Sequence, residues 1–242
     1  MFNTLLYQPL FNLLIFLYNV IPGHDFGVAI IVLTILIKVL LYPISKKSIE
    51  SQKAMNEIQP RIKEIQKKYK KDFVKQSQAL QQLYKEYKIN PFSGIFYMFI
   101  QIPIFFALFK VLRTNFDPNS LNIVYDFISR PAEINHIFLG IVNLSKANLV
   151  LAFLAGALQF IQAKMLMPKK DKQKQEGASS FSDTFQKQMV YLMPIMIFFI
   201  ATKFPAGLAL YWVTQTVLGI AQQYFALKKN KILENNHARP VN

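Results

Sequence analysis

The sequence predicts an all-α integral membrane protein with five transmembrane helices, a cytoplasmic antiparallel helical hairpin between the first two, and an N-terminal interfacial amphipathic helix. The first observation behind this prediction is the composition. The 242 residues are 52% hydrophobic, with 22 Phe and 11 Tyr, yet the formal net charge is +15. A soluble domain rarely combines so much apolar content with such an excess of positive charge. Apolar blocks in lipid and basic blocks in water account for both properties.

The second observation is a set of five apolar blocks that are long enough, or nearly so, to cross a bilayer, whose hydrocarbon core of about 30 Å needs about 20 helical residues. They are Phe26–Ile44, Phe92–Leu112, Ala147–Met167, Met189–Thr202 and Ala206–Leu227. The fourth block is short, and only the sequence KFPAG separates it from the fifth. Because Pro205 and Gly207 favour a tight turn, these two blocks are predicted to form a helical hairpin.

The third observation is the distribution of charge between the blocks. Residues 45–90 hold 12 basic and 5 acidic residues, whereas residues 114–145 hold a single basic residue, Arg130. Because basic loops of membrane proteins remain in the cytoplasm, the C-terminus is predicted to be cytoplasmic. The chain is divided accordingly into an extracytoplasmic interfacial helix, the first span, the hairpin, spans two to five with their loops, and a basic tail: 1–25, 26–44, 45–90, 91–227 and 228–242.

The N-terminal segment Thr4–Ile21 is long enough to span a membrane, but its polar residues follow a helical pattern. Gln8, Asn12 and Asn19 are spaced by four and seven residues and fall on one stripe. A helix with a polar stripe and an apolar remainder can lie in the membrane interface. The interfacial position is therefore favoured, with a spanning helix as the alternative. The segment lacks the basic region and cleavage site of a signal peptide.

The charged segment 45–90 contains two amphipathic stripes, which YKKD at Tyr69–Asp72 separates. The stripes consist of Ile49, Met55, Ile58, Ile62, Ile65 and Tyr69, then Leu80, Leu83, Tyr84 and Tyr87. They predict an antiparallel pair of helices, with a kink at Pro60. The pair is either a passive coiled coil or a recruiting surface for anionic lipid or ribosomal RNA. The polar, low-complexity residues 169–180 predict a flexible loop.

The residue inventory does not favour catalysis, and no enzyme activity is expected. The chain contains no Cys, and His24, His136 and His237 lie in separate segments, so neither a metal nor another cofactor is expected. No HExxH, GxSxG or P-loop pattern occurs. Acidic residues are nearly all outside the apolar blocks.

Lys38 is the one charged residue inside the first apolar block, where an ammonium costs roughly 2.5–3.5 kcal/mol. No acidic residue in any predicted span could pair with it. The side chain either extends toward the interface near Lys46, about 12 Å away along the helix, or faces a wet functional site among the helices. The other polar residues in the spans are explained as interhelical hydrogen-bonding groups. They are Gln101, Gln159, Gln162, Thr214, Gln215 and Thr216.

Four motifs, in order along the chain, resemble the YidC family of membrane protein insertases. They are YQPLFNLLIFLYNVIPG, MNEIQPRIKEIQKKYKKD, NPFSGIFYMFIQIPIFFALFKVL and MPIMIFFIATKFPAGLALYWVTQTVLGIAQQYF. The resemblance runs from about Tyr7 to Phe225. It implies a five-span core with a cytoplasmic hairpin and an outer amphipathic helix, in a short bacterial form without a large extracytoplasmic domain. It also implies a multi-pass protein of the bacterial plasma membrane.

The resemblance implies an insertase and chaperone that moves short polar tails of nascent membrane proteins through a hydrophilic groove open to cytoplasm and lipid. Lys38 stands where family members carry Arg in that groove, so the charge is kept but the bidentate fork is lost. The other groove positions implied are Gln101, Tyr211, Trp212 and Gln215. Nascent membrane proteins are the implied partners, with the Sec translocation channel, the ribosome and anionic lipid head groups as further candidates, and no DNA.

The alternative function is a small-solute or ion transporter that uses Lys38 as an intramembrane binding group. Transporters usually contain internal repeats and helices broken near the midplane. This sequence shows no convincing repeat and no intramembrane carboxylate for ion coupling. The insertase is therefore the favoured function.

Overall fold

The computed structural model describes residues 2–87, 89–90, 93–114, 118–167 and 181–237. The α-helices of this part are α1 (Gln8–Val20), α2 (Phe26–Leu40), α3 (Tyr42–Glu57), α4 (Gln59–Lys68), α5 (Phe73–Glu86), α6 (Ser93–Thr114), α7 (Leu149–Met165), α8 (Phe181–Ala201) and α9 (Ala206–His237). The shorter elements are a π-helical turn η1 (Asn3–Tyr7), a 3-10 helix η2 (Pro118–Ile123), and the antiparallel strands β1 (Ile137–Phe138) and β2 (Val142–Asn143). The predicted helical fold class is confirmed. The loop predicted at 169–180 lies outside the described residues.

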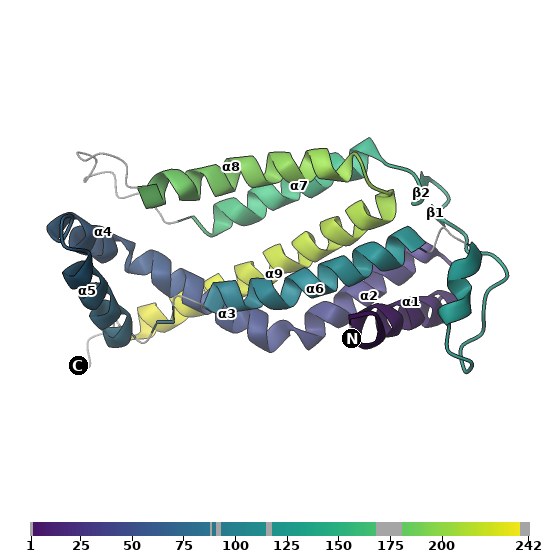
Figure 1. The fold of residues 1–242 in the computed structure, drawn as a ribbon, viewed down its shortest axis with the longest axis horizontal. Coiled ribbons are helices and arrows are strands. Elements are labelled where there is room, and N and C mark those ends of the chain that lie inside the picture. Colours follow the sequence, from purple (N-terminus) through teal and green to yellow (C-terminus); the bar gives the residue numbers. More distant parts are fainter. Residues whose placement is uncertain (1, 88, 91–92, 115–117, 168–180, 238–242) are drawn as a thin grey trace.

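The long helices run roughly along one axis of the molecule (Figure 1). α7 and α8 pack side by side, and α9 contacts α7 on one side and α2 and α6 on the other. α4 and α5 lie at one end of the molecule, and β1 and β2 lie at the opposite end (Figure 1). The largest fully buried side chains come mainly from α1, α2 and α6. α9 is thus the central helix, with neighbours on several faces.

The first apolar block does not form one straight helix. α2 ends at Leu40 and α3 begins at Tyr42, and the two helices are bent by 67°. Pro43 explains the break, because its ring nitrogen cannot donate a hydrogen bond to the carbonyl of Val39. By length and hydropathy, no single helix among the described residues is long and apolar enough to cross a membrane, whereas the bent pair of α2 and α3 is. The five spans therefore stay a prediction.

The turn between the fourth and fifth apolar blocks lies between Ala201, the last residue of α8, and Ala206, the first residue of α9. The backbone N–H groups of Ala206 and Gly207 donate to the carbonyls of Lys146 and Leu144, at 2.8 and 3.0 Å. These bonds fix the start of α9 to the loop that precedes α7. α9 continues to His237, well into the segment predicted as a tail.

The polar stripe of α1 contacts protein. Asn12 is buried, and its Nδ2 donates to the carbonyl of Ile123 at 3.2 Å while its Oδ1 accepts from the N–H of Tyr125 at 2.7 Å. Asn19 Nδ2 donates to the carbonyl of Ser129 at 2.6 Å. The large apolar side chains that α1 exposes are Phe16 and Val20. The amides of the stripe therefore anchor the segment that follows α6, and an apolar face points outward.

Replacing Asn12 with Leu is expected to lower the free energy of unfolding by about 1–3 kcal/mol, because the N–H of Tyr125 loses its partner and the carbonyl of Ile123 keeps only the longer bond from Gln8. Unfolding by denaturant in detergent measures the difference. The matched change is Asn19→Leu, which removes one hydrogen bond at a more accessible site and should cost about 1 kcal/mol. Equal losses for both variants would contradict the anchoring role of Asn12.

The segment between the first two apolar blocks also forms separate helices. α3 ends at Glu57 and α4 begins at Gln59, so the chain breaks beside Pro60, as predicted. α4 and α5 lie on either side of residues 69–72 and pack against each other. Their shared apolar cluster has Ile58, Ile62 and Leu83 at its centre. This arrangement leaves the residues of the connection and the first turn of α5 at the surface.

Candidate functional site

Lys38 lies in the last turn of α2 and is half-buried. Its Nζ donates to the hydroxyl of Tyr97 on α6 at 3.4 Å and lies 6.0 Å from the centre of that ring. In the described part of the chain, no carboxylate forms an ion pair with Lys38. The ammonium therefore contacts a neighbouring helix and has no fixed anionic partner there.

Gly219 of α9 lies directly beside this ammonium. A Cβ at Gly219 would lie 3.8 Å from Lys38 Nζ and would overlap the side-chain nitrogen of Gln162 on α7. A glycine within a helix costs roughly 0.5–1 kcal/mol relative to Ala, and here it allows close approach of a polar side chain. Because glycine has no side chain, an amide from α7 and an ammonium from α2 can both approach α9 at Gly219.

Gln101 and Tyr211 form a second polar contact, between α6 and α9. Gln101 follows Tyr97 by four residues and therefore lies on the same face of α6. Its Nε2 donates to the hydroxyl of Tyr211 at 3.0 Å. Tyr211 is only 3% exposed, so this hydrogen bond is shielded from bulk solvent. It orients one amide of α6 toward α9.

One face of α9 carries polar groups along part of its length. Tyr211, Gln215, Gly219 and Gln222 are spaced by four, four and three residues, which places them on one stripe. At the far end, Gln222 Oε1 accepts a hydrogen bond from Ser45 Oγ of α3 at 2.9 Å. The stripe extends about 17 Å along the helix axis. We call these four residues, together with Lys38, Ser45, Tyr97, Gln101 and Gln162, the polar row.

Several buried atoms of the polar row have hydrogen-bonding capacity that the described residues leave unused. They are Gln101 Oε1, Gln215 Oε1 and Gln222 Nε2. Buried polar groups of folded proteins almost always bond to protein or to ordered water. We therefore expect water, or polar groups of a bound chain, to form hydrogen bonds with these atoms between α2, α3, α6 and α9.

The structure brings four of the five residues expected at the site together and directs the fifth elsewhere. Lys38, Gln101, Tyr211 and Gln215 belong to the polar row. Trp212 is directed elsewhere: its ring packs edge-on against Phe105 of α6, with 5.4 Å between ring centres. Among the described residues, the row contains no group of three His, Asp or Glu that could hold a metal.

Five residues of the polar row were not assigned to the site from the sequence: Ser45, Tyr97, Gln162, Gly219 and Gln222. Tyr97 lies in an aromatic-rich run where one Tyr has no distinguishing feature. Gln162 has the pattern of an ordinary interhelical amide. Gly219 carried a usable signal, because it follows Gln215 by four residues on a helix face that is otherwise polar.

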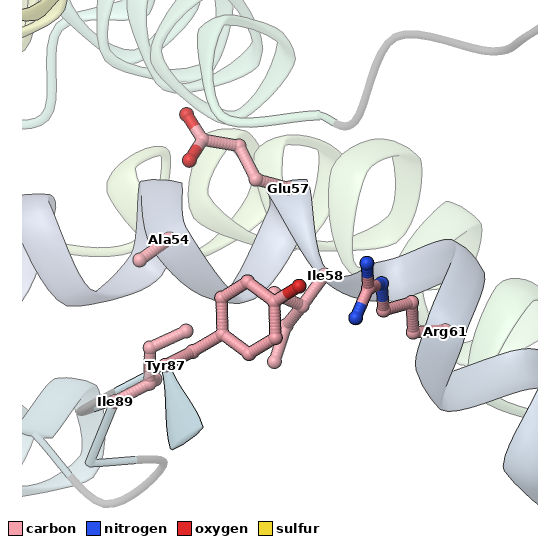
Figure 2. A pocket seen from close by; sticks show the side chains of 6 residues that line it. All are labelled: Ala54, Glu57, Ile58, Arg61, Tyr87 and Ile89. Carbon is pink, nitrogen blue, oxygen red and sulfur yellow. The ribbon is translucent and has the colours of Figure 1, made fainter. Parts of the chain in front are cut away.

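A separate cavity of about 230 Å³ lies at the base of the α4–α5 pair (Figure 2). It is lined by Ala54, Glu57, Ile58, Arg61, Tyr87 and Ile89. The Arg61 guanidinium lies 5.2 Å from the centre of the Tyr87 ring, and the Glu57 carboxylate pairs with Lys53 at 3.3 Å. The cavity contains no residue of the polar row and is distinct from the candidate site.

The fold and the polar row define a class of protein: a helical protein with polar groups and one ammonium between largely apolar helices. The chain matches the model of the 60Kd inner membrane protein family over residues 16–234. It is 34% identical over 227 residues to the membrane protein insertase YidC of Fusobacterium nucleatum, covering 93% of this chain and 98% of that protein. The chain belongs to this family, that of the YidC insertases, and is therefore a bacterial inner-membrane protein.

Other relatives are longer than this chain. It is 37% identical over 226 residues to the membrane protein insertase YidC of Syntrophus aciditrophicus, covering 92% of this chain and 36% of that protein. The corresponding protein of Syntrophobacter fumaroxidans is 38% identical over 226 residues, with 92% and 38% covered. The chain thus spans little more than a third of the length of these two relatives.

Proposed function

We propose that this protein is an insertase and chaperone that moves short polar tails of nascent membrane proteins across the bilayer and releases their apolar helices into lipid. The observation that carries the proposal is the polar row: an ammonium, several amides and two phenols between otherwise apolar helices. Membership of the YidC family supports the same activity.

The physical task of such a protein is to lower the cost of moving polar groups through about 30 Å of hydrocarbon. Each uncovered backbone or charged group costs several kcal/mol in that environment. The unused acceptors of Gln101 and Gln215 would bind N–H groups of a client, and Lys38 would attract its carboxylates. No covalent step is required. Burial of the client's apolar helix in lipid, at about 25 cal/mol per Å², supplies the free energy.

The topology belongs to the same proposal. Five apolar segments cross the membrane, α4 and α5 form a cytoplasmic hairpin, α1 lies at the extracytoplasmic interface, and the C-terminus is cytoplasmic. The outward apolar side chains of α1 support its interfacial position, because they would contact acyl chains. The bend between α2 and α3 supports a passage from the membrane into the hairpin near Leu41.

The proposed partners are nascent membrane proteins, with the Sec translocation channel, the ribosome and anionic lipid head groups as further candidates. The basic surface of residues 45–90 supports attraction to anionic partners. Deleting Lys53–Leu83 separates the two proposed roles of this segment: unchanged insertion and unchanged ribosome association would reduce the hairpin to a passive feature.

Reconstitution tests the proposed function. The purified protein is placed in liposomes without a translocation channel, and a single-span client with a short acidic tail is supplied as it is synthesised. We expect the tail to become protected from external protease in these liposomes and to stay digestible in protein-free liposomes. Solute flux through the same vesicles tests the transporter alternative. Rapid flux without tail protection would overturn the insertase proposal.

A further inference from the structure

The connection between α4 and α5 presents two neighbouring apolar side chains to solvent. Phe73 is 78% exposed and Val74 is 68% exposed. Phe73 precedes Leu80 by seven residues, so it continues the apolar stripe that packs against α4. α4 ends at Lys68, before it could cover this position. The apolar contact between the two helices therefore continues past the end of α4 as an uncovered pair of side chains.

Lysines flank this apolar pair in the sequence. Residues 67–75, which we call the hairpin tip, contain five Lys and one acidic residue, Asp72. Asp72 is engaged locally: its Oδ1 accepts from the backbone N–H of Lys75 at 3.0 Å, and its Oδ2 pairs with Lys75 Nζ at 3.2 Å. The backbone hydrogen bond, followed by the ammonium, lowers the pKa of this carboxyl. In the part of the chain that the structure describes, Lys67, Lys70 and Lys71 form no ion pair.

We infer that the hairpin tip docks on the surface of an anionic membrane, with Phe73 and Val74 inserted at the level of the head groups and the lysines bound to lipid phosphates. An exposed aromatic and a branched aliphatic side chain, flanked in the sequence by lysines, match the chemistry of an interface that is apolar beneath and anionic above. Phe73 could stack on a nucleotide base but Val74 could not, and an aromatic beside a branched aliphatic side chain favours lipid over RNA. Docking would hold α3, and through it Ser45 of the polar row, in a fixed position relative to the bilayer.

The inference rests on the proposed cytoplasmic placement of α4 and α5. The absence of Cys from the chain allows a clean test with single cysteines. V74C in the full-length protein is labelled with a nitroxide and placed in nanodiscs of phosphatidylcholine, with or without phosphatidylglycerol. Collision with oxygen, which enters lipid, is compared with collision with a water-soluble nickel complex. Q81C is the matched control, since it is exposed on the same face of α5 two turns away.

We expect the label at V74C to become shielded from the nickel complex and accessible to oxygen in phosphatidylglycerol nanodiscs, while the label at Q81C stays accessible to nickel. High salt, or the combined changes K67Q, K68Q, K70Q and K71Q, should reverse the shielding, because both weaken the attraction to anionic lipid.

Three results would overturn the inference: equal nickel access at both positions, equal shielding with and without phosphatidylglycerol, or shielding that appears only when ribosomes are added. Client insertion measured in the same preparations keeps the two proposals distinct. If the label at V74C stays accessible to nickel while client insertion is normal, only the docking inference is wrong. If the tip docks but the client is not inserted, the proposed function is contradicted.

Discussion

Replacing Lys38 with Gln is expected to reduce insertion of a client with an acidic tail by roughly 10- to 100-fold. A hydrogen bond to a charged group contributes about 1.5–3 kcal/mol, and each 1.4 kcal/mol corresponds to a factor of ten. In the described structure Lys38 is the only cation of the polar row, and Tyr97 holds it without neutralising it. Lys38→Glu should abolish insertion of the same client, because it replaces attraction by repulsion. Protease protection of the tail in proteoliposomes measures both effects.

Two controls separate charge from general damage. Lys38→Arg keeps the positive charge and should retain insertion. Lys46→Gln removes a lysine of α3 whose side chain is 42% exposed and pairs with Glu50 at 3.9 Å, so it should have little effect. A client whose tail carries no acidic residue should depend less on Lys38. Full insertion of the acidic client by Lys38→Gln would show that the cation is not needed for it.

Replacing Gly219 with Leu is expected to reduce insertion of every client, acidic or neutral, by about tenfold or more, since 1.4 kcal/mol of lost stabilisation already suffices. Any Cβ at this position overlaps the Gln162 side chain and lies 3.8 Å from Lys38 Nζ. A leucine would displace the amide and place an apolar group in the middle of the polar row. Insertion assays with both clients measure the loss.

The matched control for Gly219→Leu is Ala221→Leu. Ala221 is exposed on another face of α9, two residues further along the same helix. The same leucine there should leave insertion unchanged, and thermal unfolding in detergent should show that both variants are folded. Normal insertion by a folded Gly219→Leu variant would exclude this part of α9 from the path of the client.

The helices were predictable because their signals are local. The apolar block beginning at Phe26, the stripes around Ile62 and Leu83, and the break at Pro60 follow from periodicity and proline chemistry, and the structure contains each of them. The break at Leu41 was not anticipated, although Pro43 supplies its cause. The apolar run predicted the length of the first membrane block. The direction of the chain after the bend depends on packing against α6 and α9, which the run does not indicate.

The site was only partly predictable, because its geometry depends on contacts between helices. The unpaired charge of Lys38 marked it from the sequence alone. The contributions of Tyr97 and Gln162 depend on which faces of α6 and α7 pack against α9. A single sequence does not determine those faces. The stripe of α1 shows the same limit: the sequence placed its amides on one helix face, but it did not indicate that Asn12 bonds to the segment around Ile123 and Tyr125.

In the proposed mechanism, the polar tail of a client passes along the polar row. The most direct measurement places a photo-crosslinking amino acid at Gln101 or at Gln215 and illuminates a ribosome-stalled client with an acidic tail. Phe99 of α6 is the control, because it is 63% exposed and lies on the opposite face of the same helix. We expect crosslinks to the tail from Gln101 and Gln215 and none from Phe99. Crosslinks to the tail from Phe99 alone would contradict this mechanism.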